Sequence, residues 1–217
     1  MCGRYTLTVS NRRLVAERFE LQDGQLSGDL LHRFNVCPTE HVLAVDSEHH
    51  AHTARWGLQL PRGKAPPQIN VRSETAARRR VFARLISNAS HRCLVPADGW
   101  YEWLRAEKPR VKPAPMRYTV DGGELFAFAG LLDHDRLAIL TTIPNELCAK
   151  VHDRMPCVLG GPEEEAAWLD SEVDAATASE LLGPLDAARV SAAPVSKLVN
   201  RAGNEGEELL QPDPALF

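Results

Sequence analysis

The chain has 217 residues, a formal net charge of −4 and 44% hydrophobic residues, which fits one globular domain over residues 1–217. We expect a cytoplasmic protein without a membrane span, because no run of about 18 apolar residues and no secretory signal pattern occurs. Five cysteines without a Cys-x-x-Cys pair argue against a disulfide framework and against a zinc ribbon. We expect four of them to be small buried hydrophobes: Cys37, Cys93, Cys148 and Cys157.

Charge is distributed unevenly along the chain. Residues 55–118 carry 14 basic and 4 acidic side chains, a net of +10, whereas residues 119–217 carry 6 basic and 18 acidic side chains, a net of −12. This asymmetry indicates one face that attracts phosphate and another that is only solvated. The alternative is that the run Arg78-Arg79-Arg80 simply decorates an exposed helix face.

Hydrophobic periodicity predicts an amphipathic helix over residues 10–21, with Leu14, Phe19 and Leu21 in the core. Further helices are predicted over residues 75–86, 162–169 and 173–182. The helix over 162–169 begins with three glutamates, which the helix dipole favours in a first turn.

Short apolar runs bounded by turn residues predict β-strands. These runs cover residues 42–45, 54–58, 93–95, 118–120, 125–129 and 137–141. The proline-containing stretches 61–67 and 108–115 are predicted as loops, the second as a loop or hairpin connection. Because no long strand–helix alternation occurs, we predict an α+β fold with a curved, barrel-like, antiparallel-rich sheet and peripheral helices.

Cys2 gives the chain an unusual chemical group. Removal of Met1, which requires a small second side chain, leaves an α-amine and a thiol on adjacent carbons. The α-amine titrates near ~7.7–8.0 and the thiol near ~8.5, so both are usable nucleophiles close to neutral pH. Such a 1,2-aminothiol cleaves an amide, or captures an aldehyde as an imine and closes to a thiazolidine ring. The alternative is that cysteine at position 2 is chance.

Four further segments place polar groups among apolar ones. They are Arg-Phe-Asn-Val-Cys-Pro at 33–38, Gln-Ile-Asn-Val-Arg-Ser-Glu-Thr at 68–75, Pro-Ala-Asp-Gly-Trp-Tyr-Glu-Trp at 96–103 and Val-His-Asp-Arg-Met-Pro at 151–156. Glu102 lies between two aromatic residues, which desolvate a carboxylate, raise its pKa and suit it to general acid–base catalysis. The alternatives are that Glu102 is a strand residue facing water and that His152 is a structural or exposed histidine.

Together with Met-Cys-Gly-Arg-Tyr at 1–5, these segments closely resemble the SRAP family, the SOS-response-associated peptidases and abasic-site-shielding proteins. The resemblance continues to Pro-Val-Ser at 194–196 and Glu-Leu-Leu-Gln-Pro at 208–212, so it covers nearly the whole chain. It implies the SRAP fold, a monomer, no cofactor and no metal. It also implies a sensor that binds single-stranded DNA containing abasic sites and associates with the nucleoid during DNA damage.

The resemblance further implies a covalent DNA–protein crosslink and the residues that make it. Cys2 attacks the aldehyde of the ring-opened sugar, first through its amine and then through its thiol. Glu102 assists sugar ring opening, and Asn70 holds the N-terminus or the sugar. His152 shuttles protons, a task that suits its near-neutral pKa. The same residues are implied to remove Met1 as a thiol autopeptidase and to give lyase-like activity on DNA.

The resemblance implies a set of DNA-binding residues that includes phosphate-gripping arginines. The set is Arg4, Asn35, Pro38, Arg72, Arg80 and Thr141. We expect binding that weakens with salt and reads little sequence. Many relatives carry one or two aromatics where this chain has Leu-Pro-Arg-Gly-Lys at 60–64, so we expect charge to substitute for base stacking there.

Other functions remain open at this point. One is a non-covalent module for single-stranded DNA, another an N-terminal-nucleophile glutamine amidotransferase, which also begins Met-Cys-Gly, and a third a protease acting in trans. The tract His49-His50-Ala51-His52 resembles a metal-binding tract, but Glu48 is its only nearby carboxylate and we expect an exposed turn without metal. The acidic C-terminal third is expected to be a solvated surface.

Overall fold

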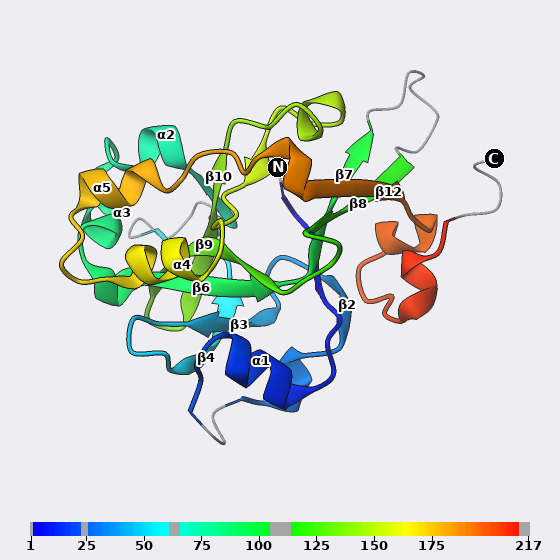
Figure 1. The fold of residues 1–217 in the computed structure, drawn as a ribbon, viewed down its shortest axis with the longest axis horizontal. Helices are drawn as coiled ribbons and strands as arrows, with labels where there is room; N and C mark the ends of the chain where they lie inside the picture. Colours follow the sequence, from blue (N-terminus) through cyan, green and yellow to red (C-terminus); the bar gives the residue numbers. More distant parts are fainter. Residues whose placement is uncertain (1, 23–25, 61–65, 105–113, 213–217) are drawn as a thin grey trace.

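The computed structural model describes residues 2–22, 26–60, 66–104 and 114–212, which form two β-sheets with helices around them (Figure 1). The strands are β1 (Tyr5–Leu7), β2 (Arg33–Val36), β3 (His41–Val45), β4 (Ala51–Trp56), β5 (Asn70–Arg72), β6 (Arg92–Ala97), β7 (Gly99–Leu104), β8 (Ala114–Val120), β9 (Phe126–Asp133), β10 (Arg136–Thr142), β11 (Met155–Pro156) and β12 (Val190–Pro194). The α-helices are α1 (Arg12–Arg18), α2 (Ser73–Ala76), α3 (Arg80–Ile86), α4 (Pro162–Leu169) and α5 (Ala175–Glu180). None of the helices in these ranges is long and apolar enough to span a membrane.

The larger sheet closes into a barrel. Its pairings run from β3 to β4, to β10, to β9, to β6 and back to β3, so no edge is left in this ring. The pairings of β10 with β4 and β5 are parallel, and the other pairings in the ring are antiparallel. The prediction of an α+β fold with an antiparallel-rich, barrel-like sheet is therefore confirmed.

The smaller sheet has the order β12-β8-β7-β1-β2 and lies against the barrel. Aromatic side chains join the two sheets. Tyr5 of β1 meets Trp56 and Phe128 of the barrel edge-on, with ring centroids 5.4 and 5.8 Å apart, and Trp100 of β7 meets Phe126 and Phe128. Because β1 lies in this shared core, the residues just before it are held in the interior.

Helices α2, α3, α4 and α5 cover one side of the barrel, whereas the C-terminal 3₁₀ turns lie beside β8 and β12 on the other side (Figure 1). Helix α4 begins with Pro162 and three glutamates, as its sequence predicts. One of these, Glu165, is buried and makes a two-pronged ion pair with Arg18, with both N–O distances 2.7 Å. This pair fastens α4 to the end of α1.

The first predicted helix is shorter than residues 10–21, because Asn11 caps it by accepting a hydrogen bond from the Arg13 N–H at 3.0 Å. The assignment of Leu14 to the core is wrong: it is 53% exposed, and Val15 takes the buried position. Phe19 and Leu21 are buried as predicted, although both lie beyond the end of the helix.

The helix predicted over residues 75–86 is two helices, α2 and α3. The break falls within the arginine run, where Arg79 has extended backbone angles and its guanidinium lies over the Phe82 ring at 4.8 Å. Two other boundaries also shift. The strand predicted over residues 54–58 is β4, and the helix predicted over 173–182 is α5, which Asp174 caps.

All five cysteines are free and buried, which confirms the prediction for the four downstream of Cys2. The predicted loop over residues 61–67, and with it the segment 60–64 without aromatics, lies largely outside the described residues. So does most of the predicted 108–115 connection. Its last residue, Pro115, belongs to β8, and β8 pairs antiparallel with β7 as a hairpin does.

Candidate active site and DNA interface

The N-terminal segment brings Cys2 beside Glu102. In the antiparallel pair of β1 and β7, Tyr5 lies opposite Trp100, and the Tyr101 N–H donates to the Arg4 carbonyl at 3.0 Å. Antiparallel register runs in opposite directions on the two strands, so Cys2 lies near the position of Glu102. Cys2 is fully buried, and its Sγ lies 3.8 Å from the Arg4 carbonyl oxygen.

Asn70 holds the Cys2 backbone. Its Nδ2 donates to the Cys2 carbonyl oxygen at 2.7 Å. Asn70 is the first residue of β5, where it lies opposite Ile139 of β10, so the central barrel strand sets its position. Its Oδ1 is buried and has no hydrogen-bond partner among the described residues. The Asn70 amide therefore fixes the Cys2 backbone through its nitrogen and presents a hydrogen-bond acceptor through its oxygen.

The two titratable groups of this site have shifted pKa values. Burial raises the pKa of the Cys2 thiol, and the negative charge of Glu102 raises it further. Burial also raises the pKa of Glu102 to about 7; attraction to the chain's α-amino group opposes the rise, and the Asp153 carboxylate adds to it. At neutral pH the thiol is therefore protonated, and Glu102 is divided between its acid and base forms.

His152 lies in a turn that a buried arginine fixes. The His152 Nδ1 lies 2.9 Å from an Asp153 carboxylate oxygen and 3.1 Å from the Arg154 N–H. The Arg154 guanidinium makes two hydrogen bonds to Glu74, at 2.5 and 2.9 Å, and a third to the Thr141 carbonyl at 2.6 Å. Because Asp153 acts on the pKa of Glu102, this turn lies close to Glu102.

Arg154 and Glu74 are residues to which the sequence analysis gave no role. Both occur within quoted motifs, but they are 80 positions apart along the chain, so their ion pair is not readable from spacing. Glu74 follows β5 directly, at the start of α2. The pair thus ties the His152 turn to the strand that carries Asn70.

The residues assigned to DNA fall into three groups. Arg72 and Arg80 are exposed, on β5 and at the start of α3, and Pro38 is half-buried in the turn after β2. Thr141 is fully buried, with its hydroxyl 3.3 Å from Arg154, so it supports that arginine instead of facing solvent. Arg4 belongs to an internal network together with Asn35, the sixth assigned residue.

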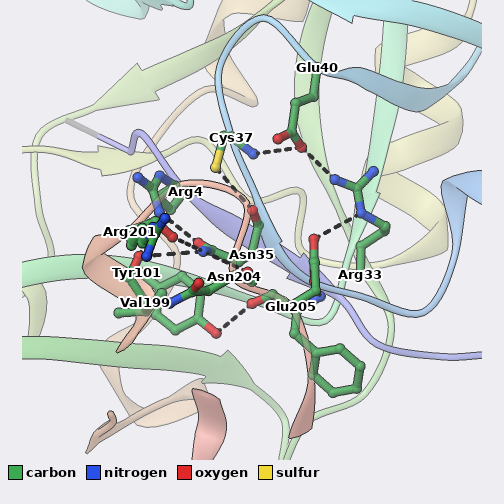
Figure 2. A network of polar contacts seen from close by, with 11 residues as sticks. Arg4, Arg33, Asn35, Cys37, Glu40, Tyr101, Val199, Arg201, Asn204 and Glu205 are labelled. Carbon is green, nitrogen blue, oxygen red and sulfur yellow. Dashed lines mark hydrogen bonds and ion pairs between the residues drawn. The ribbon is translucent and has the colours of Figure 1, made fainter. Parts of the chain in front are cut away.

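Figure 2 shows this network between the N-terminal strands and the C-terminal segment. The Nη1 atom of Arg4 donates to Asn35 Oδ1 and to the Val199 carbonyl oxygen, both at 2.7 Å. The Asn35 Nδ2 donates to the carbonyls of Arg201 and Asn204 at 3.2 and 3.0 Å. The two side chains therefore hold the chain that follows β12 over β1 and β2.

Glu205 continues the network at its outer side. It accepts from Arg33 Nε at 3.0 Å and from the Phe34 N–H at 2.6 Å, and Arg33 also pairs with Glu40 (Figure 2). Tyr101 donates its hydroxyl to the Phe34 carbonyl at 2.8 Å. The acidic C-terminal third is thus more than a solvated surface, because Glu205 pairs with the half-buried Arg33 of β2.

We expect Asn35→Ala to lower the free energy of unfolding by about 1–3 kcal/mol, because it leaves buried carbonyls of the C-terminal segment without donors. Urea unfolding of wild type and variant measures the difference. Asn11→Ala, at the exposed cap of α1, is the matched control, and it is expected to cost about 1 kcal/mol or less. Equal and negligible losses at the two positions would contradict a fastening role for the network.

Not all of the basic middle segment is available to DNA. Arg92 is 1% exposed and donates to the Asp170 and Val173 carbonyls, and Arg117 pairs with buried Asp98 at 3.2 Å. Among the described residues, the exposed Arg72 lies on β5 and the exposed Arg78, Arg79 and Arg80 lie where α2 meets α3, whereas the exposed Arg55 lies apart from them on β4. The charge count along the sequence therefore overestimates the extent of the basic surface. The exposed arginines that do form a basic surface lie on and next to β5, the strand that carries Asn70.

In the histidine tract, His49 and His50 lie between β3 and β4 and His52 lies on β4, and all three are half-buried instead of exposed. The sequence analysis overlooked a second carboxylate. Asp46 accepts from His52 Nε2 at 2.7 Å and lies 3.5 Å from His50 Nδ1. Among the described residues, no group of three or more histidine, cysteine and carboxylate side chains is arranged to hold a metal ion.

The barrel and the smaller sheet make this an α+β protein. Its candidate site combines the buried thiol of residue 2 with a carboxylate, an amide and an imidazole. The model of the SOS response associated peptidase (SRAP) family matches residues 1–202, and this chain belongs to that family.

Two relatives and one solved structure illustrate the similarity. The abasic site processing protein YoqW of Bacillus subtilis is 36% identical over 97% of this chain and 99% of its own. The abasic site processing protein YedK of Escherichia coli is 33% identical over 98% of this chain and 100% of its own. A crystal structure of a Bacteroides thetaiotaomicron protein, 22% identical, shares the fold with a TM-score of 0.84 over 98% of this chain and all of that one.

Proposed function

We propose that this protein captures abasic sites in single-stranded DNA by forming a thiazolidine between the deoxyribose aldehyde and Cys2 after Met1 is removed. The observation that supports this proposal most is the placement of Cys2: Asn70 holds its carbonyl, and its thiol is close enough to Glu102 for the carboxylate to raise the pKa of the thiol, while the pKa of Glu102 itself is about 7. The names of relatives that align along nearly the whole chain support the same substrate.

The chemistry follows from the protonation states. The neutral α-amine of Cys2 adds to the aldehyde carbon, and one of its protons passes to the new alkoxide to give a carbinolamine. Protonated Glu102 then gives a proton to the departing hydroxyl, so that water leaves, and the ionised Glu102 takes the remaining proton from nitrogen, so that a neutral imine forms and Glu102 is protonated again. The thiol sulfur then adds to the imine carbon, its proton passes to the imine nitrogen, and the five-membered ring closes. One water is released overall. Because burial keeps the thiol protonated, the amine reacts first.

His152 has the supporting role in this scheme. An imidazole that changes charge near neutral pH can carry protons between solvent and the reacting atoms. Asp153 and the Arg154 backbone both contact its Nδ1, and these contacts hold the imidazole ring in the turn close to Glu102. We assign to the same groups the hydrolysis of the Met1–Cys2 peptide bond and the lyase-like reactions of the DNA adduct.

DNA binding is assigned to the exposed arginines next to the site. Arg72 and Arg80 extend from β5 and α3, so a strand that passes over them presents its sugars to Cys2 and Asn70. Guanidinium groups grip phosphate without reading bases. Pro38 at the turn after β2 borders the same region in this proposal.

We expect affinity for intact single-stranded DNA to fall steeply between low and moderate salt, and the slope of log K against log salt to become shallower by about one unit or less per arginine in Arg72→Ala and Arg80→Ala. Fluorescence anisotropy over a salt series measures this. Arg13→Ala, which removes an arginine that pairs with Glu17 on α1, is the control for net charge and leaves the slope unchanged. A nearly flat salt response of the wild type would overturn the assignment.

A further inference from the structure

The wall of the site next to Glu102 carries an aromatic pair from two strands. In the antiparallel pair of β7 and β8, Trp100 lies opposite Tyr118 and Glu102 lies opposite Met116. Side chains two positions apart share a face of a sheet, so these four side chains face the same side. Tyr118 is thereby the diagonal neighbour of Glu102, a spacing that a long aromatic side chain spans.

Each of the two aromatic residues carries a buried polar atom that has no hydrogen-bond partner in the described part of the chain. Trp100 and Tyr118 are 0% and 1% exposed, and their rings stack with centroids 5.2 Å apart. Within the described residues, neither Trp100 Nε1 nor the Tyr118 hydroxyl has a hydrogen-bond partner. A buried hydroxyl without a partner destabilises a fold, so its presence beside an acid–base group calls for an explanation.

Tyr118 is electrostatically close to the site. The titratable groups that face Glu102 are Cys2, Tyr118, Cys148, Asp153 and the chain's α-amino group. Burial raises the pKa of Tyr118, and the charges of Cys148 and Glu102 raise it further. The phenol therefore stays protonated throughout the neutral range, and toward a carboxylate it acts only as a hydrogen-bond donor.

We propose that Tyr118 is a positioning residue whose hydroxyl donates a hydrogen bond to the Glu102 carboxylate when Glu102 gives up its proton. The hydroxyl is then satisfied in the step that needs it. A hydrogen bond to the ionised form favours that form, so Tyr118 lowers the pKa of Glu102 and keeps both of its forms populated at neutral pH. This role rests on the proposed function of Glu102 as the acid–base group.

The test is the titration of Glu102 by carbon NMR in protein labelled at glutamate carboxyl groups, with Glu102→Gln identifying the signal. We expect Tyr118→Phe to raise the pKa of Glu102 by about one unit. The alkaline limb of the pH–rate profile for adduct formation is expected to move upward by the same amount. The thermal midpoint stays unchanged or rises, because the variant removes a buried hydroxyl that has no partner among the described residues.

Tyr101→Phe is the matched control, because Tyr101 is on β7 next to Glu102, is as buried as Tyr118 and donates its hydroxyl to the Phe34 carbonyl instead. We expect it to lower the thermal midpoint and to leave the Glu102 titration unchanged. An identical Glu102 pKa in wild type and Tyr118→Phe would overturn the proposal. Because the titration needs no DNA, a wild type that forms no adduct would count against the proposed function alone.

Discussion

Cys2→Ala is expected to abolish the heat-stable adduct with an abasic single-stranded oligonucleotide. Alanine is as small as cysteine, so Met1 is still removable and an α-amine is still presented. That amine forms an imine, which water reverses, but no sulfur is present to close the ring. Denaturing gels after heating measure the loss of the adduct. Borohydride, which reduces an imine to a stable amine, is expected to restore a crosslink in the variant.

Cys148→Ala provides the matched control for this loss. Cys148 is also a buried thiol close enough to Glu102 for the carboxylate to raise its pKa, but it has no adjacent α-amine. We expect it to form the adduct at a rate close to that of the wild type. Two outcomes would contradict the aminothiol chemistry. One is a heat-stable adduct in Cys2→Ala, and the other is loss of the adduct in Cys148→Ala but not in Cys2→Ala.

Glu102→Gln is expected to slow adduct formation by about 10²–10⁴-fold, the usual contribution of a general acid or base. The wild-type rate is expected to peak between the pKa of Glu102, about 7, and that of the α-amine, near ~8. On the acid side the amine becomes protonated, and on the alkaline side Glu102 loses the proton that it must donate. The variant is expected to lose the alkaline limb.

Glu102→Gln, which is expected to slow adduct formation, is expected to increase the stability of the folded protein at neutral and alkaline pH. The pKa of Glu102 rises from 4.5 in the unfolded chain to about 7 in the folded protein, so the folded state binds the extra proton between these values. Stability therefore falls as pH rises from about 4.5 to 7 and then stays level, a loss of roughly 3 kcal/mol from this group. Glu102→Gln removes this loss, which urea unfolding at pH 5 and pH 8 measures.

Glu163→Gln, on the exposed first turn of α4, is the control for both effects of Glu102→Gln. It makes the same chemical change at an exposed position on another element, and we expect neither the rate profile nor the pH dependence of unfolding to change. A Glu102→Gln variant that keeps the wild-type rate and the alkaline limb would exclude Glu102 as the acid–base group.

The sequence predicted the barrel strands and α4 well because their signals are local. Buried apolar runs identify β3, β6 and β10, and Pro162 with three glutamates identifies the start of α4. It did not predict β1, β2, β5 and β7 as strands, because these carry the motif residues and mix polar with apolar side chains. These segments include two interior strands of the smaller sheet, β1 and β7, its edge strand β2, and β5, which pairs with β10.

The site residues also differ in how far the sequence alone could identify them. Cys2, Asn70 and Glu102 were named from motifs, and the structure brings these three together. Arg154 with Glu74, and Tyr118, were missed because their importance depends on partners that lie far away along the chain or across a strand pair. The charge count likewise could not separate buried arginines from exposed ones.

Covalent capture of abasic DNA through Cys2 is tested by the intact mass of the protein after mixing with an abasic single-stranded oligonucleotide, without borohydride. For the wild type we expect a species that lacks Met1 and has the summed mass of protein and oligonucleotide minus one water. For Cys2→Ala we do not expect this species. A wild-type protein that lacks Met1 and stays at its free mass would contradict covalent capture and leave a non-covalent DNA-binding module in its place.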